Sequence, residues 1–163
     1  MIEPGAGDNH IVVRAGEPHE APALREIAIA AKAHWGYGME RVRQWAEGDF
    51  SIEALHARQL FVADNDGTMA GWASTIPQGE VCWLEDLWID PAWMGNGLGS
   101  LLFRHAAERA QQQGAKVLEW EAEPNAVGFY EKMGGRYLRP SKTTEWGRRL
   151  PVMGISLEPA ERS

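Results

Sequence analysis

The chain has 163 residues and a formal net charge of −7, and 44% of its residues are hydrophobic and 24% charged. This length suits one domain with a continuous core, and the composition excludes an intrinsically disordered chain. The acidic balance argues against a nucleic acid as partner, because proteins that bind a phosphate backbone usually carry clustered lysine and arginine.

Further sequence features bear on the location of the protein and on whether it binds a metal. Residues 1–10 lack the basic start and apolar run of a signal peptide, so we expect a flexible tail there and a single domain at 11–163. No apolar run approaches the roughly 20 residues that cross a bilayer, so we expect a cytoplasmic protein with no membrane partner. Cys82 is the single cysteine and is expected to be buried, and the histidines have no metal-ligand spacing, so no metal is expected.

The N-terminal third predicts one strand and two helices. A β-prone run at 11–14 is followed by an apolar stripe at helical spacing from 19 to about 32. The aromatic, glycine-rich segment 34–38 interrupts this pattern, and a shorter helix is expected from Met39 to Gly48.

The middle of the chain predicts three strands. Two apolar runs at 60–63 and 69–76 flank the pair Asp66-Gly67, which supplies the positive φ of a tight hairpin turn. The aromatic and β-branched run at 81–89 has the length of a long strand, and Asp90-Pro91 ends it.

The C-terminal half begins with a glycine-rich turn and an amphipathic helix that ends before Gly114. A strand at 117–122, a short helix at 125–133 and two further strands near 136–138 and 152–157 follow. The order βααβββαβαββ predicts an α/β (α+β) domain with about seven strands and about four helices.

The turn between the long strand and the amphipathic helix is the most informative segment. Glycines at 95, 97 and 99 let consecutive N–H groups converge on an anion, and the helix dipole adds to the attraction, so a pyrophosphate would suit this turn. The Lys-Ser/Thr pair of a P-loop is missing, and the spacing is not that of a dinucleotide-binding GxGxxG motif. The alternative is that these glycines only close a strand-to-helix turn.

Two segments together resemble the GNAT N-acetyltransferase family. Met94-Gly95-Asn96-Gly97-Leu98-Gly99 is similar to its pyrophosphate-binding segment, although the family usually has Arg or Gln where this chain has Met94. Pro124 to Gly134 is similar to its second coenzyme-contacting motif, and the resemblance covers roughly 60–138. It implies the GNAT fold, with a mixed, mostly antiparallel sheet, and acetyl-CoA as co-substrate. The residues that it places against the coenzyme are Leu87, Trp88, Ile89, Met94, Gly95, Asn96, Gly97, Leu98, Gly99, Ser100, Asn125, Phe129 and Tyr130.

The chemistry of amine acetylation points to two candidate catalytic residues. An alkylammonium must lose a proton before it attacks a thioester, and Glu85 is the candidate general base, directly or through water. Tyr130 matches the family position whose phenol can protonate the departing thiolate. The alternatives are a solvated strand carboxylate for Glu85 and ordinary packing for Tyr130.

The acceptor is expected to be a primary amine of a small molecule or an exposed amino group of a protein. In this family the region between the first two helices covers the acceptor, and aromatic faces there could hold a cation by cation–π attraction, aided by the charges of Glu85 and Asp86. The alternative is core packing of the tryptophans, and a further alternative is a GNAT-shaped module that binds coenzyme A or a ligand without turnover. Exposed strand edges could pair two copies as a homodimer. The candidate acceptor-binding residues are His34, Trp35, Tyr37, Trp72 and Glu85.

Overall fold

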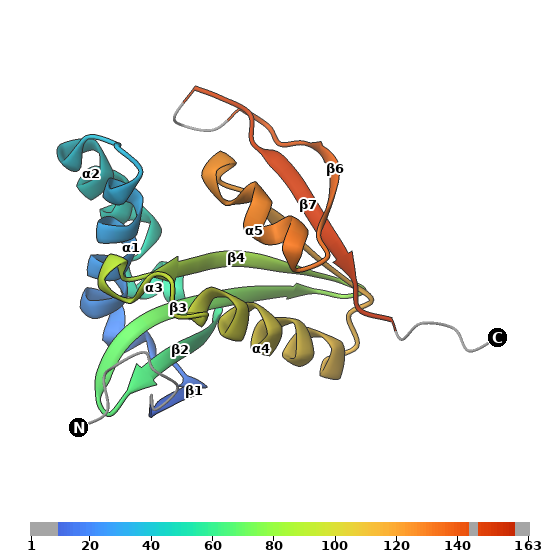
Figure 1. The fold of residues 1–163 in the computed structure, drawn as a ribbon, viewed down its shortest axis with the longest axis horizontal. Helices are drawn as coiled ribbons and strands as arrows, with labels where there is room; N and C mark the ends of the chain where they lie inside the picture. Colours follow the sequence, from blue (N-terminus) through green and yellow to red (C-terminus); the bar gives the residue numbers. More distant parts are fainter. Residues whose placement is uncertain (1–9, 144–146, 159–163) are drawn as a thin grey trace. The chain divides into compact units, whose positions relative to one another are not determined.

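The computed structural model describes residues 10–143 and 147–158, so most of the expected N-terminal tail lies outside the described residues (Figure 1). The strands and helices follow the predicted order with one addition, a third helix before the hairpin. They are β1 (Ile11–Ala15), α1 (Ala21–His34), α2 (Met39–Asp49), α3 (Ile52–His56), β2 (Gln59–Asn65), β3 (Thr68–Gln78), β4 (Val81–Ile89), α4 (Leu98–Gln112), β5 (Val117–Glu121), α5 (Val127–Lys132), β6 (Arg136–Pro140) and β7 (Pro151–Ser156).

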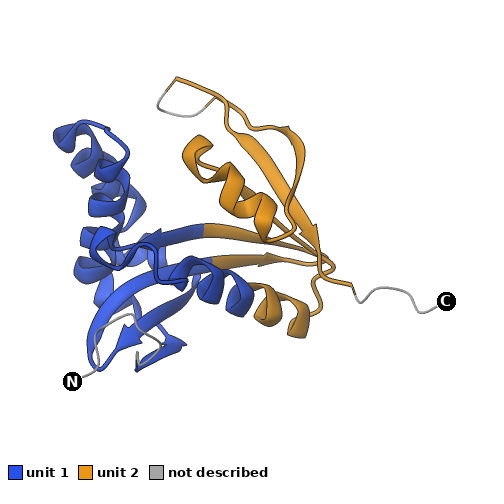
Figure 2. Cartoon of the chain, in the orientation of Figure 1, with its two compact units in different colours: residues 1–74, 86–106 blue, residues 75–85, 107–163 orange. Residues whose placement is uncertain are grey.

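The strands form one seven-stranded sheet in the order β1-β2-β3-β4-β5-β7-β6. β4 and β5 run parallel, whereas β1–β2, β5–β7 and β6–β7 are antiparallel, so the expected mixed, mostly antiparallel sheet is confirmed. The chain divides into two compact units, residues 1–74 with 86–106 and residues 75–85 with 107–163, called here unit 1 and unit 2 (Figure 2).

In unit 1 the predicted apolar stripe of α1 is buried, which explains why this segment folds as an amphipathic helix. The buried stripe consists of Ala21, Leu24, Ile27, Ala28 and Ala31. The hairpin turn is also confirmed, because Asp66 and Gly67 have φ angles of 50° and 91° and the Gly67 amide donates to Asp64 Oδ1 at 2.7 Å.

The sequence prediction missed α3, and the expected number of about four helices is therefore one too low for the described residues. With only five residues, α3 is too short to produce a visible hydrophobic period. Its start does carry a capping signal, since the Ser51 hydroxyl accepts from the Ala54 amide at 3.2 Å.

In unit 2 the central strand is β5, whose Leu118 and Trp120 side chains are buried, as is Ala122 directly after the strand. β5 pairs with β7 along its whole length, from Val117↔Ser156 to Glu121↔Val152. The outer strand β6 is exposed at every residue, and its register with β7 shifts between Tyr137 and Arg139. None of the described helices is long and apolar enough to cross a membrane.

Candidate active site

The glycine-rich turn lies in unit 1 and is built by a series of local capping contacts. After β4 ends at Ile89, the Asp90 carboxylate accepts from the Ala92 amide at 2.9 Å and begins a short 3-10 turn. Gly95 and Gly97 then have φ angles of 85° and 77°, a conformation that L side chains rarely adopt. α4, a helix of 15 residues, begins directly after Gly97, so the turn lies at the N-terminus of this helix.

The first turn of α4 presents backbone amides that the helix itself does not use. The Leu101 amide donates to Gly97 O at 3.1 Å, and the amides in the first turn of an α-helix have no acceptor within the helix. The positive end of the helix dipole lies at the same place. This arrangement fits the anion site that the sequence predicts.

Two side chains of the predicted coenzyme-binding set have structural roles in this turn. The Asn96 amide group donates to Trp93 O at 3.0 Å, so this side chain holds the turn closed. The Leu98 side chain is 3% exposed and anchors the start of α4 in the core. The side chains of both residues are therefore engaged within the protein, and only their backbone groups remain as candidate ligand contacts.

The C-terminal half of β4 is fixed against β3. The Asp90 amide donates to Ala70 O at 3.0 Å, and a Cβ on Gly71 would lie 2.9 Å from Trp88 O. The absence of a side chain at Gly71 therefore allows the two strands to approach closely. The side chains of Leu87, Trp88 and Ile89 are half-buried.

The Trp88 indole is held by a carboxylate and by other rings. Its N–H donates to Asp86 Oδ1 at 3.0 Å, and its ring meets the rings of Trp45 and Phe50 edge-on at 5.5 and 6.4 Å between centroids. Phe50 in turn contacts Trp72 at 5.4 Å. These four residues, Trp45, Phe50, Trp72 and Trp88, form what we call the aromatic cluster of unit 1.

Asp86 contacts the aromatic cluster through the Trp88 indole and is almost fully buried. Its carboxylate accepts from Arg58 Nη1 at 2.8 Å, from the Ser74 hydroxyl and from the Trp88 indole. Burial raises the pKa of Asp86, while the nearby guanidinium and the three hydrogen bonds act in the opposite direction. The expectation that Asp86 attracts a cationic acceptor is not supported, because Arg58 already compensates its charge. The sequence offered no signal for this partner, which is 28 residues away.

Glu85 belongs to unit 2 and alternates with buried neighbours. Leu84 and Asp86 are buried and Glu85 is exposed, so the two acidic residues point to opposite faces of β4. In unit 2 the parallel pairing of β4 with β5 covers Val81 to Trp83 and does not continue at Leu84. The register of the β4–β5 pair thus ends at Trp83, two residues before Glu85.

Tyr130 lies on α5 in unit 2, and its side chain is 8% exposed. Its ring contacts those of Trp120 and Phe129 at 5.0 and 5.1 Å. Its carbonyl accepts from the Gly135 amide at 2.9 Å, which closes the turn after α5. Asn125, just before this helix, is exposed and its amide group donates to Glu123 Oε1 at 3.0 Å.

Besides Glu85, the predicted acceptor-binding residues belong to unit 1 and divide into three groups. His34 and Trp35 are exposed and their rings meet edge-on at 5.2 Å. Tyr37 is half-buried and its ring lies 5.1 Å from the Lys32 ammonium. Trp72 is fully buried and its indole donates to Leu24 O at 2.8 Å, so a contact of Trp72 with the acceptor is not supported. Core packing accounts for this tryptophan.

Proteins of similar sequence are named as N-acetyltransferases. An uncharacterised N-acetyltransferase of Methanocaldococcus jannaschii is 31% identical over 121 residues, which are 66% of this chain and 54% of that protein. A peptidyl-lysine N-acetyltransferase of Salmonella typhimurium is 33% identical over 72 residues, 44% of this chain and 48% of that protein. The chain thus spans about half the length of the curated relatives that it matches.

The fold is shared with solved structures. The PaiA N-acetyltransferase of Thermoplasma acidophilum, solved in complex with coenzyme A, superposes with a TM-score of 0.75 at 19% identity and covers 90% of this chain and 98% of its own. Residues 22–135 match the family described as the acetyltransferase (GNAT) family, a range that includes the glycine-rich turn, β4 and α5. The chain therefore belongs to the GNAT acetyltransferase family.

Proposed function

We propose that this chain is an acetyl-CoA-dependent N-acetyltransferase that acetylates a primary amine of a small molecule or an exposed amino group. The observation that carries the proposal is the turn at Gly95 and Gly97, whose positive φ angles lead the chain into the N-terminus of α4. Backbone amides at the N-terminus of a helix are suited to bind a pyrophosphate.

The coenzyme contacts are assigned mainly to the backbone. Met94 carries no charge, so the amides of residues 95–100 supply the attraction to the pyrophosphate, without the side-chain contact that Arg or Gln would add. The main chain of Leu87 to Ile89 is assigned to the pantetheine arm, with Asn125 and Phe129 as further contacts.

Two side chains are assigned to proton movements. Acetyl-CoA would supply the acyl thioester. Glu85 accepts a proton from the acceptor ammonium, so that the neutral amine nitrogen can form the new C–N bond. The Tyr130 phenol donates a proton to the sulfur that leaves when the C–S bond breaks.

An assay of thiol release with acetyl-CoA and a panel of amines tests this function. The panel should include alkylamines, diamines, amino acids and lysine-containing peptides, with mass spectrometry of the products. Acetylation of at least one amine, at a rate that depends on Glu85, is expected. Binding of coenzyme A with no acetylation of any amine would overturn the proposal.

The second candidate is a module that binds coenzyme A without turnover, and Met94 is the observation that favours it. Met94→Arg separates the two candidates. In an enzyme with weak coenzyme binding this variant should lower the KM for acetyl-CoA and leave kcat unchanged, whereas in a binding module it should raise affinity without producing turnover.

A further inference from the structure

The main chain at the end of β4 is oriented by its contact with β3. The Asp90 amide donates to Ala70 O of β3 at 3.0 Å, and Trp88 O also lies against β3. Peptide groups point alternately to the two edges of a strand, so those of Leu87 and Ile89 face the edge away from β3. A pantetheine arm that pairs with this segment therefore meets the peptide groups of Leu87 and Ile89.

The Trp88 side chain, which lies between these two residues in the strand, is tied to Asp86. Residues two positions apart share a face of a strand, and Trp88 Nε1 donates to Asp86 Oδ1 at 3.0 Å. The other carboxylate oxygen, Oδ2, accepts from Arg58 Nη1 at 2.8 Å and from the Ser74 hydroxyl. Two donors thus fix Oδ2, and this orientation presents Oδ1 to the indole. All four residues belong to unit 1.

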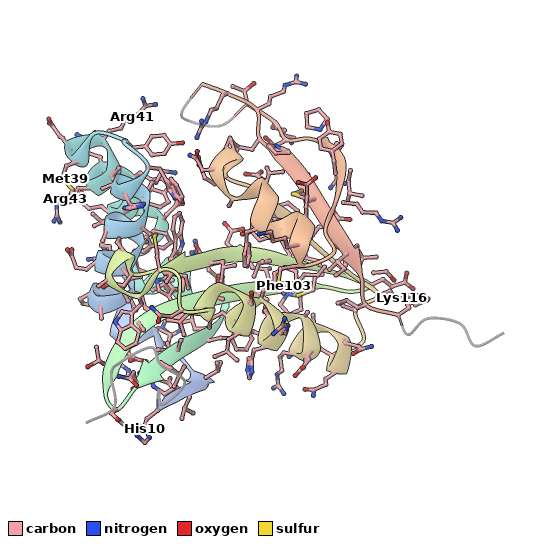
Figure 3. All side chains as sticks on the ribbon, viewed as in Figure 1. His10, Met39, Arg41, Arg43, Phe103 and Lys116 are labelled. Carbon is pink, nitrogen blue, oxygen red and sulfur yellow. The ribbon has the colours of Figure 1, made fainter. Side chains whose placement is uncertain are left out.

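The Trp88 ring is also held by its neighbours in the aromatic cluster. It meets the rings of Trp45 and Phe50 at 5.5 and 6.4 Å between centroids. Trp45 belongs to α2, which exposes Arg43 to solvent (Figure 3) and brings Trp45 against the Trp88 ring. A side chain that is held both at its N–H and at its ring keeps one rotamer, and the backbone to which it is attached is restrained with it.

A buried charged pair is an inefficient way to stabilise a protein. The Asp86 and Arg58 side chains are only 4% and 9% exposed, and replacing such a pair by well-packed apolar residues is often neutral or stabilising. A carboxylate that accepts three hydrogen bonds does, however, define one geometry for its partners. The arrangement is therefore explained better by how firmly it orients β4 than by the stability that it adds.

We propose that Asp86 and Trp88 are positioning residues for the coenzyme. Their hydrogen bond restrains the main chain of β4, so that the peptide groups of Leu87 and Ile89 keep the orientation that pairs with the pantetheine arm. Arg58 in turn holds the carboxylate. Both residues act through the main chain and not on the reacting atoms. This inference rests on the proposed acetyltransferase function and names further residues of the same site.

Trp88→Phe tests the hydrogen bond directly, because it keeps an aromatic ring in the cluster and removes the N–H that reaches Asp86. An apparent dissociation constant rises when a smaller fraction of the protein has the competent geometry. The Kd for coenzyme A should therefore rise about fivefold, the factor that corresponds to one lost hydrogen bond. Calorimetry with the full chain measures this change. Unchanged affinity would overturn the inference.

Trp72→Phe is the matched control, because it removes the same kind of donor from another buried hydrogen bond of unit 1. The Trp72 indole donates to Leu24 O of α1 at 2.8 Å. This variant should lower the midpoint of urea unfolding, since a buried hydrogen bond is lost, and should leave the Kd for coenzyme A unchanged. An equal rise of the Kd in both variants would attribute the effect to general loosening and would overturn the inference.

ADP separates the pantetheine arm from the rest of the coenzyme. It has the diphosphate but lacks the arm, so its binding depends on the turn before α4 and not on β4. Saturation-transfer NMR should give the same ADP signal with Trp88→Phe as with the wild type. A loss of the ADP signal as large as the loss of affinity for coenzyme A would overturn the inference. If neither protein binds ADP, the comparison of Trp88→Phe with Trp72→Phe decides it.

A double-mutant cycle tests whether Asp86 and Trp88 act together. Asp86→Asn keeps the shape of the side chain but removes its charge and should also raise the Kd for coenzyme A. Adding Trp88→Phe to this variant should change the Kd little further, because the same contact is already weakened. Additive effects of the two substitutions would overturn the inference.

These measurements need no turnover, so they remain distinct from the test of the proposed function. If the wild type binds coenzyme A but acetylates no amine, the proposed function fails and the affinities of the variants still decide the inference. If amines are acetylated but Trp88→Phe binds coenzyme A like the wild type, only the inference fails. A wild type that does not bind coenzyme A would overturn both.

Discussion

Arg58 and Asp86 form an ion pair of 2.8 Å in which the two side chains are only 9% and 4% exposed. The second Arg58 nitrogen, Nη2, donates to Asp49 O at 2.8 Å, so one guanidinium joins the C-terminus of α2 to β4. The same carboxylate holds the Trp88 indole. The pair therefore supports the strand whose backbone is assigned to the coenzyme.

Replacing Arg58 should destabilise the protein strongly. Arg58→Leu leaves the Asp86 carboxylate buried without its partner, and breaking such pairs costs about 3–5 kcal/mol. Urea unfolding followed by circular dichroism measures this loss. Arg43→Leu, which breaks the exposed pair with Glu26, should cost less than about 1 kcal/mol. Similar losses in the two variants would show that the buried pair has no special weight.

Gly97→Val should abolish binding of coenzyme A, as measured by calorimetry. The valine side chain would cover the amides before α4 and strain a residue with a φ angle of 77°. Gly67→Val is the matched control, because Gly67 has a φ angle of 91° and equally open surroundings in the β2–β3 turn. This control should be strained to a similar extent but bind coenzyme A normally. Unchanged affinity in Gly97→Val would remove the turn from the site.

Glu85→Gln should lower kcat mainly at neutral pH, with recovery as the pH rises toward the pKa of the acceptor amine. Without the base, the rate depends on the fraction of amine that is already neutral, and this fraction grows with pH. A pH–rate profile from neutral to alkaline pH measures the effect. Glu80→Gln, at an exposed position directly before the same strand, should leave the profile unchanged. The same profile in Glu85→Gln and wild type would remove Glu85 from the mechanism.

Gly135→Ala should reduce both stability and activity. An added Cβ would lie 2.8 Å from the Trp120 ring and 2.9 Å from Tyr130 O, so the turn that follows α5 must move. Such overpacking costs about 1–3 kcal/mol and would displace the proposed acid Tyr130. Gly128→Ala on α5 meets no atom within 4 Å and should instead stabilise the helix by about 1 kcal/mol. Thermal unfolding and kcat should separate the two variants.

Cys82 should react slowly with thiol reagents at neutral pH. Burial raises the pKa of its thiol, and the hydrogen bond with Thr75 lowers it to a smaller extent. Labelling with a disulfide reagent should therefore be slow in the native protein and fast in urea. Rapid labelling of the native chain would show that unit 2 opens easily around β4.

The sequence predicted the elements with strong local signals. The bounds of β4 at 81–89 agree with the structure, because nine β-prone residues lie between a glycine turn and Asp90-Pro91. The stripe of α1 and the Asp66-Gly67 turn were equally clear. α3 was missed because five residues carry no period, and only its cap at Ser51 could have indicated it.

The site was harder to predict because its contacts join distant parts of the chain. The turn at Gly97 could be predicted because its backbone conformation depends on glycines that are adjacent in the sequence. The pairing of Asp86 with Arg58 and the burial of Trp72 depend on how strands and helices pack, so nothing near either residue signals them. The sequence assigns Tyr37 to a cationic acceptor, whereas in the structure the ammonium of Lys32 lies 5.1 Å from the centroid of its ring.

The irregular outer strand β6 limits how the sheet can grow. A further strand needs a regular row of amide and carbonyl groups, but the ladder is interrupted between Tyr137 and Arg139, and Pro140 offers no N–H. The exposed Tyr137 and Leu138 are therefore carried on an edge that resists aggregation, and the protein can keep apolar side chains there without polymerising through them.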